Sequence, residues 1–94
     1  MATRLLLRPA MSLVVLTYQH PLRTTDGRVY TVRACGRERA GGTWEGWLGF
    51  TPVDGVGREL RTGQETTQPN RDAVADWASG LEPIYFEGAF TRAS

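Results

Sequence analysis

The clearest alternation of hydrophobic and polar positions runs over residues 43–51, where Trp44, Leu48 and Phe50 share one parity. A period of two is what a half-buried strand requires, because successive side chains of a strand point to opposite faces of the sheet. A glycine pair before the stretch and a proline after it mark its limits. The pattern therefore predicts a central strand with Trp44, Leu48 and Phe50 facing the core.

Three further stretches are candidate strands. Residues 29–37 repeat the alternation, and we expect them to pair antiparallel with residues 43–51 through the glycine-containing loop between them. Residues 12–18 are apolar on both parities, which suits a short strand buried on both faces or, as an open alternative, a buried helical turn. Residues 58–66 contain one large apolar residue, Leu60, and predict at most a charged edge strand.

A helical pattern appears only over residues 70–81. Asn70 suits the N-cap, and Gly80 and the proline three residues later suit the helix end. The apolar positions recur with the spacing of a helix that packs on a sheet: Ala73, Val74, Trp77, Ala78 and Leu81.

We expect this helix to approach the sheet closely through Trp77. Its ring should pack over Gly46 or Gly88, between Trp44 and Phe86, because glycines inside strands leave room for a neighbour. The same glycines are also compatible with a ligand that lies against bare backbone.

Residues 84–92 complete the fold as a last strand in this interpretation, with Ile84, Phe86 and Phe90 inward and Tyr85 and Glu87 outward. The predicted class is α+β: an antiparallel sheet of four to five strands with one helix on one face, in the order β-β-β-β-α-β. The 94 residues are expected to form a single domain over residues 12–94, preceded by a loosely ordered extension over residues 1–11.

Composition and charge bear on the cellular compartment and on the kinds of partner. The net charge of +1 gives no general argument for a nucleic-acid or membrane partner. The apolar run near the N-terminus is interrupted by Arg8-Pro9 and is too short to span a bilayer. A single cysteine, Cys35, fits a reducing compartment. We therefore expect a cytoplasmic protein that does not enter the membrane.

Candidate catalytic chemistry is sparse. His20 is the only histidine and lies beside a proline in a predicted loop, and Cys35 has no second cysteine to act with. Arginines on its strand face would lower the thiol pKa somewhat, but a small half-buried residue is the simpler interpretation. Glu45 and Glu87 have the chemistry of an acid–base pair, but cross-strand ion pairs with arginines explain them equally well. We expect neither an enzyme nor a bound cofactor or metal.

The outward face of the predicted sheet is the best candidate site. By parity it carries Arg33, Arg37, Trp47 and Tyr85, together with acidic residues. Exposed aromatic and arginine side chains are enriched in protein–protein contacts, which predicts binding of a protein partner or self-association. The alternative is a single-stranded nucleic-acid platform using Arg33, Arg37, Arg39 and Trp47, since bases stack on aromatic rings. A merely solvated face also remains open.

The element order also resembles a known family. Three strands over residues 29–66, the helix over 70–81 and the strand over 84–92 are similar to the core module of HicB-like antitoxin proteins. The resemblance implies an α+β fold and an antitoxin-like, protein-binding role. The segments Trp44-Glu45-Gly46-Trp47 and residues 65–71 also resemble small bacterial proteins to which no function is assigned.

Overall fold

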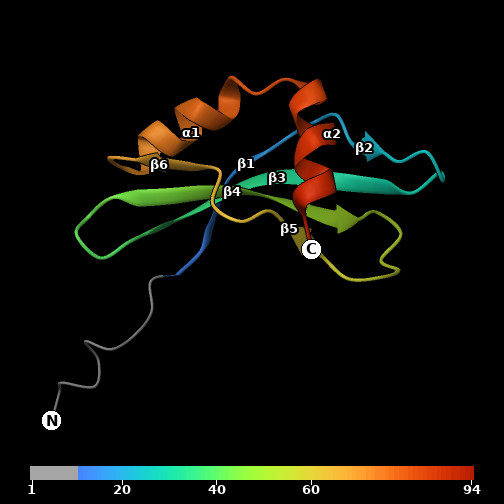
Figure 1. Cartoon of the computed structure of the whole chain (residues 1–94), viewed down its shortest axis with the longest axis horizontal. Helices are drawn as coiled ribbons and strands as arrows, with labels where there is room; N and C mark the ends of the chain where they lie inside the picture. Colours follow the sequence, from blue (N-terminus) through green and yellow to red (C-terminus); the bar gives the residue numbers. More distant parts are fainter. Residues whose placement is uncertain (1–10) are drawn as a thin grey trace, which may run out of the picture.

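The computed structural model describes residues 11–94, and the extension expected over residues 1–11 lies, except for Met11, outside them. It is an α+β fold with six antiparallel strands and two helices (Figure 1). The strands are β1 (Leu13–Thr17), β2 (Leu22–Arg23), β3 (Val29–Glu38), β4 (Trp44–Pro52), β5 (Leu60–Arg61) and β6 (Thr66–Gln68). The helices are α1 (Arg71–Ser79) and α2 (Pro83–Arg92).

The long hairpin of β3 and β4 forms the centre of the sheet. It pairs in continuous register from Tyr30 opposite Pro52 to Glu38 opposite Trp44. Strands β1 and β2 both pair with β3, while β5 and β6 both pair with β4. The edge strand expected over residues 58–66 is thus two short strands with an irregular segment between them.

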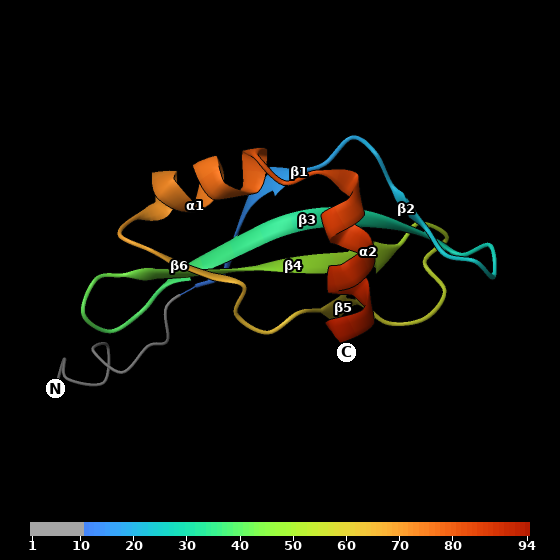
Figure 2. The same cartoon turned by 45° about the horizontal axis from the view of Figure 1, so that its top comes forward.

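Both helices pack on the same face of the sheet (Figures 1 and 2). The core on this face contains alternate residues of β3 and β4, among them Val32, Ala34, Leu48 and Phe50, all without exposed surface. Leu48 and Phe50 therefore face the core as predicted, and Trp44 shares their face but stays half-exposed. Cross-strand burial of this kind is the main stabilising force of such a sheet.

Helix α1 begins as the sequence predicts. The side chain of Asn70 accepts a hydrogen bond from the backbone N–H of Ala73 at 2.8 Å, which satisfies one of the free donors of the first turn. The residue above the sheet glycines is Val74, however, and not Trp77. A Cβ atom at Gly46 would lie 3.0 Å from Val74 Cγ1, and one at Gly36 3.4 Å from the same atom. The predicted position of Trp77 is therefore wrong, and its ring packs at the margin of the core.

The strand expected over residues 84–92 is helix α2. Pro83 occupies its first turn, where the missing N–H costs nothing. Phe86 lies 4.5 Å from the ring of Tyr18, and Phe90, one turn later, lies 4.9 Å from Tyr30 and 5.2 Å from Phe50. Ile84, expected inward, is 73% exposed. The one-helix, four-to-five-strand order is corrected accordingly.

The chain ends on the sheet. The backbone of Ser94 exchanges two hydrogen bonds with that of Arg61, at 3.1 and 3.3 Å, and so extends the sheet beyond β5. The outward backbone groups of Arg61 in β5 are thereby satisfied by Ser94.

Candidate functional site

The sheet face opposite the two helices carries most of the candidate residues. We call it the open face, because no helix or strand of residues 11–94 packs on it. The pairing register places the following residues there: Arg33, Cys35 and Arg37 of β3, Glu45, Trp47, Gly49 and Thr51 of β4, and Arg61 of β5. The register thus brings together Arg33, Arg37 and Trp47 as the sequence predicts.

Trp47 lies on the expected face but is not an exposed aromatic. Only 4% of its surface is accessible. The guanidinium carbon of Arg61 lies 4.0 Å from the ring centroid, and that of Arg37 lies 5.8 Å away. Such cation–π contacts contribute about 0.5–2 kcal/mol each, depending on how much water is excluded. The Trp47 ring is therefore buried under Arg37 and Arg61, and the two arginine side chains form the accessible surface at this point of the open face.

Arg37 is neutralised within the face. It lies directly opposite Glu45 in the register, and its Nε donates to Glu45 Oε2 at 2.6 Å. This is the cross-strand ion pair that the sequence suggested for Glu45. A partly exposed pair of this kind contributes only about 0.2–1 kcal/mol to stability, but it removes Arg37 as a free cation.

Arg33, Gly49 and Arg61 form one cross-strand row, which we call the arginine row. Gly49 is the register partner of both arginines. Two inter-strand spacings separate the Cα atoms of Arg33 and Arg61, or roughly 10 Å. A Cβ atom at Gly49 would meet only the sulfur of Cys35, at 3.9 Å. The row thus has an arginine on each side of a residue without a side chain, and the two guanidinium groups extend in opposite directions along β4, Arg33 to Thr51 and Arg61 to Trp47.

Both guanidinium groups keep hydrogen-bond donors for a further partner. Arg33 Nη1 donates to Thr51 Oγ1 at 3.0 Å, and Arg61 Nε donates to the carbonyl of Thr62 at 3.0 Å. Each guanidinium has five N–H donors, so most of them are not engaged by these bonds. Thr51 in turn donates to Glu59 Oε2 at 2.9 Å, which places a carboxylate at the edge of the row.

The thiol of Cys35 lies beneath the arginine row. Burial raises the pKa of Cys35, while the charge of Arg61 opposes the shift, that of Glu59 adds to it and that of Arg33 opposes it. Neighbouring arginines therefore do lower this pKa, as expected of Arg33, but the loss of water around the thiolate outweighs them and the net shift is upward. The arrangement is that of a half-buried structural cysteine, not an activated one.

Tyr85 does not belong to the open face. It lies on α2, on the opposite side of the sheet, and its hydroxyl donates to Glu65 Oε1. Arg92 Nη2 donates to the same carboxylate oxygen at 2.6 Å. Burial and the hydrogen bond to Glu65 raise the pKa of Tyr85. A strand over residues 84–92 would place Tyr85 on the face of Trp47, but helix α2 places it on the other side of the sheet.

Arg39, the fourth arginine of the nucleic-acid alternative, lies just after β3, in the loop that leads to β4. Its Nη1 donates to Gln64 Oε1 at 3.1 Å, and its backbone pairs with Thr43 across the hairpin loop. Arg61, in contrast, was absent from both predicted sites. The sequence signal that points to Arg61 is its position next to the apolar Leu60. Neighbouring residues of a strand face opposite sides, so if Leu60 faces the core, Arg61 lies on the open face.

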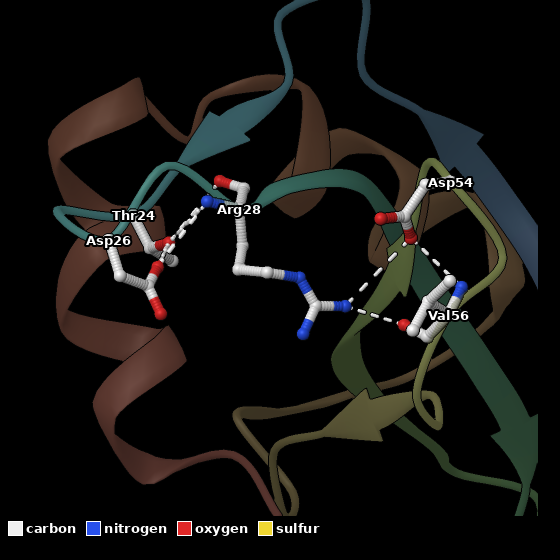
Figure 3. A network of polar contacts seen from close by, with 5 residues as sticks. All are labelled: Thr24, Asp26, Arg28, Asp54 and Val56. Atoms are coloured by element: carbon white, nitrogen blue, oxygen red, sulfur yellow. Dashed lines mark hydrogen bonds and ion pairs between the residues drawn. The ribbon is translucent and has the colours of Figure 1, made fainter.

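A second polar cluster joins the turns at the far end of the sheet (Figure 3). The backbone N–H of Arg28 donates to Thr24 Oγ1 at 3.0 Å and to Asp26 Oδ1 at 3.3 Å. Its side chain reaches the other turn, where it donates to the carbonyl of Val56 and lies 3.9 Å from Asp54. The hydrogen bonds from Thr24 and from the backbone of Arg28 hold the pKa of Asp26 below its ordinary value. Arg28 thus ties the β2–β3 turn to the β4–β5 turn.

Two hollows of about 290 and 270 Å³ lie beside this cluster, between the β2–β3 turn and α2. They share Thr24, Thr25 and Phe90, and Glu87 lines the larger one. Glu87 is therefore on the helix side of the sheet, whereas Glu45 is on the open face. The structure does not bring these two carboxylates together as an acid–base pair.

Within residues 11–94, no group of three or more His, Cys, Asp or Glu side chains is arranged to hold a metal ion. No helix in the same range is long and apolar enough to cross a membrane. Comparison with protein-family models, with curated proteins and with solved structures finds no match for this chain.

Proposed function

We propose that this protein is a non-enzymatic interaction domain that binds an acidic segment of a protein partner on its open face. The observation that carries the proposal is the arginine row. The two arginines lie on either side of Gly49 in the register, and each keeps free guanidinium donors, so an acidic segment that crosses the row can place carboxylates against both. Arginine forks match carboxylate geometry and form charge-assisted hydrogen bonds of about 1.5–3 kcal/mol.

The surroundings of the row favour a protein partner over a nucleic acid. The open face includes two carboxylates, on Glu45 and Glu59, and its Arg37 is already paired. Trp47, the stacking platform of the nucleic-acid alternative, is 4% exposed beneath the arginines. Base stacking requires an accessible aromatic face, and a phosphate backbone requires several free cations. Mixed charge of this kind is more typical of a protein contact.

A defined peptide array tests the proposal. Peptides with central Asp or Glu residues and sequence-matched amide versions are titrated into the labelled protein, while the side-chain Nε–H resonances of Arg33 and Arg61 are followed by NMR. The proposal predicts saturable shifts for acidic peptides only. The double variant Arg33→Ala/Arg61→Ala should lose binding, whereas Arg71→Ala, an exposed arginine at the start of α1, should not.

Binding that survives the double variant, or no binding by any acidic peptide, would refute the role of the arginine row. The nucleic-acid alternative is decided by mixed oligonucleotides in the same titration. It predicts shifts whose affinity falls steeply with salt, because each phosphate contact releases counterions.

An antitoxin-like role is one specific case of such protein binding, and it comes from the resemblance to HicB-like proteins. Helix α2 replaces the last strand of the element order on which that resemblance rests. A toxin-like gene beside the gene for this protein would supply a defined partner, and an acidic segment in that partner would be the expected ligand of the arginine row.

A further inference from the structure

Short strands form both edges of the sheet, β1 and β2 beside β3 and β5 and β6 beside β4, and the outer sides of β5 and β1 differ. At the β5 edge, the backbone of Ser94 occupies both hydrogen-bonding groups of Arg61. At the β1 edge, no backbone group of residues 11–94 pairs with the outer side of the strand. An unpaired edge presents free N–H and C=O groups that can accept another strand.

The side chains of this edge are unusually apolar for a surface. Met11 is 74% exposed, Leu13 39% and Val14 52%, and residues 11–17 contain no charge and no proline. Charged residues and proline are the common means by which proteins keep an edge strand from pairing. The remaining protection is a β-bulge between Val14 and Leu16, which breaks the regular ladder.

We infer that the β1 edge pairs antiparallel with the β1 edge of a second copy of this chain. The proposal concerns a surface other than the arginine row and does not depend on the role proposed for that row. It commits to a second copy because the edge is self-complementary. Residues 12–17 read Ser-Leu-Val-Val-Leu-Thr, which is nearly the same in both directions. Two such segments related by a two-fold axis place apolar residues opposite apolar residues.

Charge also permits the pairing. Arg33 is the nearest open-face cation and lies one strand away from β1, opposite Thr17. Across a β1–β1 contact, three inter-strand spacings would separate the two copies of Arg33, or roughly 14 Å. This exceeds the screening length of about 8 Å at physiological ionic strength, so the repulsion is weak. The bulge limits the ladder to short segments, and we therefore expect a reversible dimer that depends on concentration.

The experiment combines sedimentation with amide exchange on the full chain over a range of concentrations. The wild type should change from monomer to dimer as its concentration rises. The N–H of Tyr18 points inward and donates to Val32, at 3.0 Å, so that of Thr17 points to the outer edge. Exchange of the Thr17 amide should slow as the dimer forms, while that of Tyr18, the internal control, should depend much less on concentration.

Matched charge variants locate the contact. Val14→Lys should weaken dimerisation by about tenfold or more, because each copy loses an apolar contact and gains a like charge at the axis. Val53→Lys, at a similarly exposed valine in the β4–β5 turn, should dimerise like the wild type.

Arg61→Glu separates this inference from the proposed function: it should abolish binding of acidic peptides and leave dimerisation unchanged. A wild type that stays monomeric at its highest soluble concentration, or a dimer that Val14→Lys does not weaken, would overturn the inference. Equal weakening of dimerisation by Val53→Lys would also overturn it, because the effect would then come from the added charge and not from its position on β1.

Discussion

Gly46 is the position where the packing of helix on sheet can be tested most directly. In Gly46→Ala the new Cβ atom would lie 3.0 Å from both Val74 Cγ1 and Thr66 Cγ2, and 3.4 Å from the carbonyl oxygen of Cys35. Carbon atoms in ordinary contact are about 3.5–4.0 Å apart. The neighbours must therefore move by several tenths of an ångström.

Val74 has little freedom to move. It is fully buried, and a β-branched residue in a helix has essentially one side-chain rotamer. The helix itself must shift, and such overpacking costs about 1–3 kcal/mol. Replacing a glycine by alanine also stabilises the fold by about 0.4–1 kcal/mol, because it lowers the conformational entropy of the unfolded chain. We expect Gly46→Ala to lower the free energy of unfolding by about 1–2 kcal/mol, a substantial part of the roughly 5–14 kcal/mol typical of a domain this size.

Urea unfolding followed by tryptophan fluorescence measures the change. Gly49→Ala is the matched control on the same strand, because its Cβ atom would meet only Cys35 Sγ at 3.9 Å. It should be neutral or stabilising by up to about 1 kcal/mol. A midpoint that falls in Gly46→Ala and not in Gly49→Ala, with an unchanged slope, assigns the loss to contacts above Gly46.

A double-mutant cycle identifies the contact. Val74→Ala removes Cγ1 and costs roughly 1.5–3 kcal/mol in the wild type. It should cost about 1 kcal/mol less in Gly46→Ala, because one of the two closest contacts is relieved. The same cycle with Trp77→Ala should be additive. Additivity with Val74 within about 0.5 kcal/mol, or coupling with Trp77 instead, would refute the packing described here.

Three further variants test other parts of the structure. The Tyr18 hydroxyl donates to the carbonyl of Ala78 at 2.7 Å, and burial, followed by the charge of Tyr85, raises the pKa of Tyr18 from 10.0 to about 12. The stability that the protonated Tyr18 hydroxyl contributes is therefore complete below about pH 10 and is lost as the pH rises towards 12. Tyr18→Phe should lower the free energy of unfolding by about 0.5–1.5 kcal/mol at pH 8, and thermal melts of the variant should show a smaller loss of stability between pH 10 and 12 than those of the wild type. Trp47→Ala should cost about 3 kcal/mol in urea, although it lies on the open face, and a loss below about 1 kcal/mol would show that the arginines do not bury it. Thr62→Val should cost about 1–3 kcal/mol, because the buried hydroxyl accepts from the N–H of Leu48 at 3.1 Å, and a loss of less than about 0.5 kcal/mol in thermal melts would show that this N–H finds another partner.

The central hairpin and α1 could be predicted because their patterns are long and unambiguous. In β3 and β4 the period of two holds over most of nine or ten residues, and the register then follows from the loop. In α1 the N-cap, the apolar stripe and the glycine at the end all agree. Identifying Val74 as the residue over the glycines needs the rotation of the helix on the sheet, which the stripe alone does not fix.

Residues 83–92 could not be assigned from their pattern. Ile84, Phe86 and Phe90 fit a strand, whereas Phe86, Ala89 and Phe90 fit a helix equally well. Gly88 lowers helix propensity by about 1 kcal/mol but weakens a strand as well, so it does not decide between the two. Tertiary packing of the two phenylalanines on the sheet decides for the helix, and with it Tyr85 leaves the predicted site.

The open face was predicted only in outline. Parity placed Arg33, Arg37 and Trp47 on it, because all three belong to long strands of continuous register. Arg61 belongs to a strand of two residues, whose register no periodicity can fix. Yet Arg61 both covers Trp47 and completes the arginine row, so the sequence suggested an exposed aromatic where the protein has a pair of cations.

The order of the elements along the chain has a consequence for how the protein is made. All six strands precede both helices, so the apolar face of β3 and β4 emerges from the ribosome before the segment that covers it. Until residues 71–92 emerge, Val32, Leu48 and Phe50 lack the helices that cover them, and nascent chains in that state are prone to aggregate. Truncation before residue 71 should therefore be far more harmful to yield than the loss of a few surface residues, and holding chaperones would be most needed until residues 71–92 can fold onto the sheet.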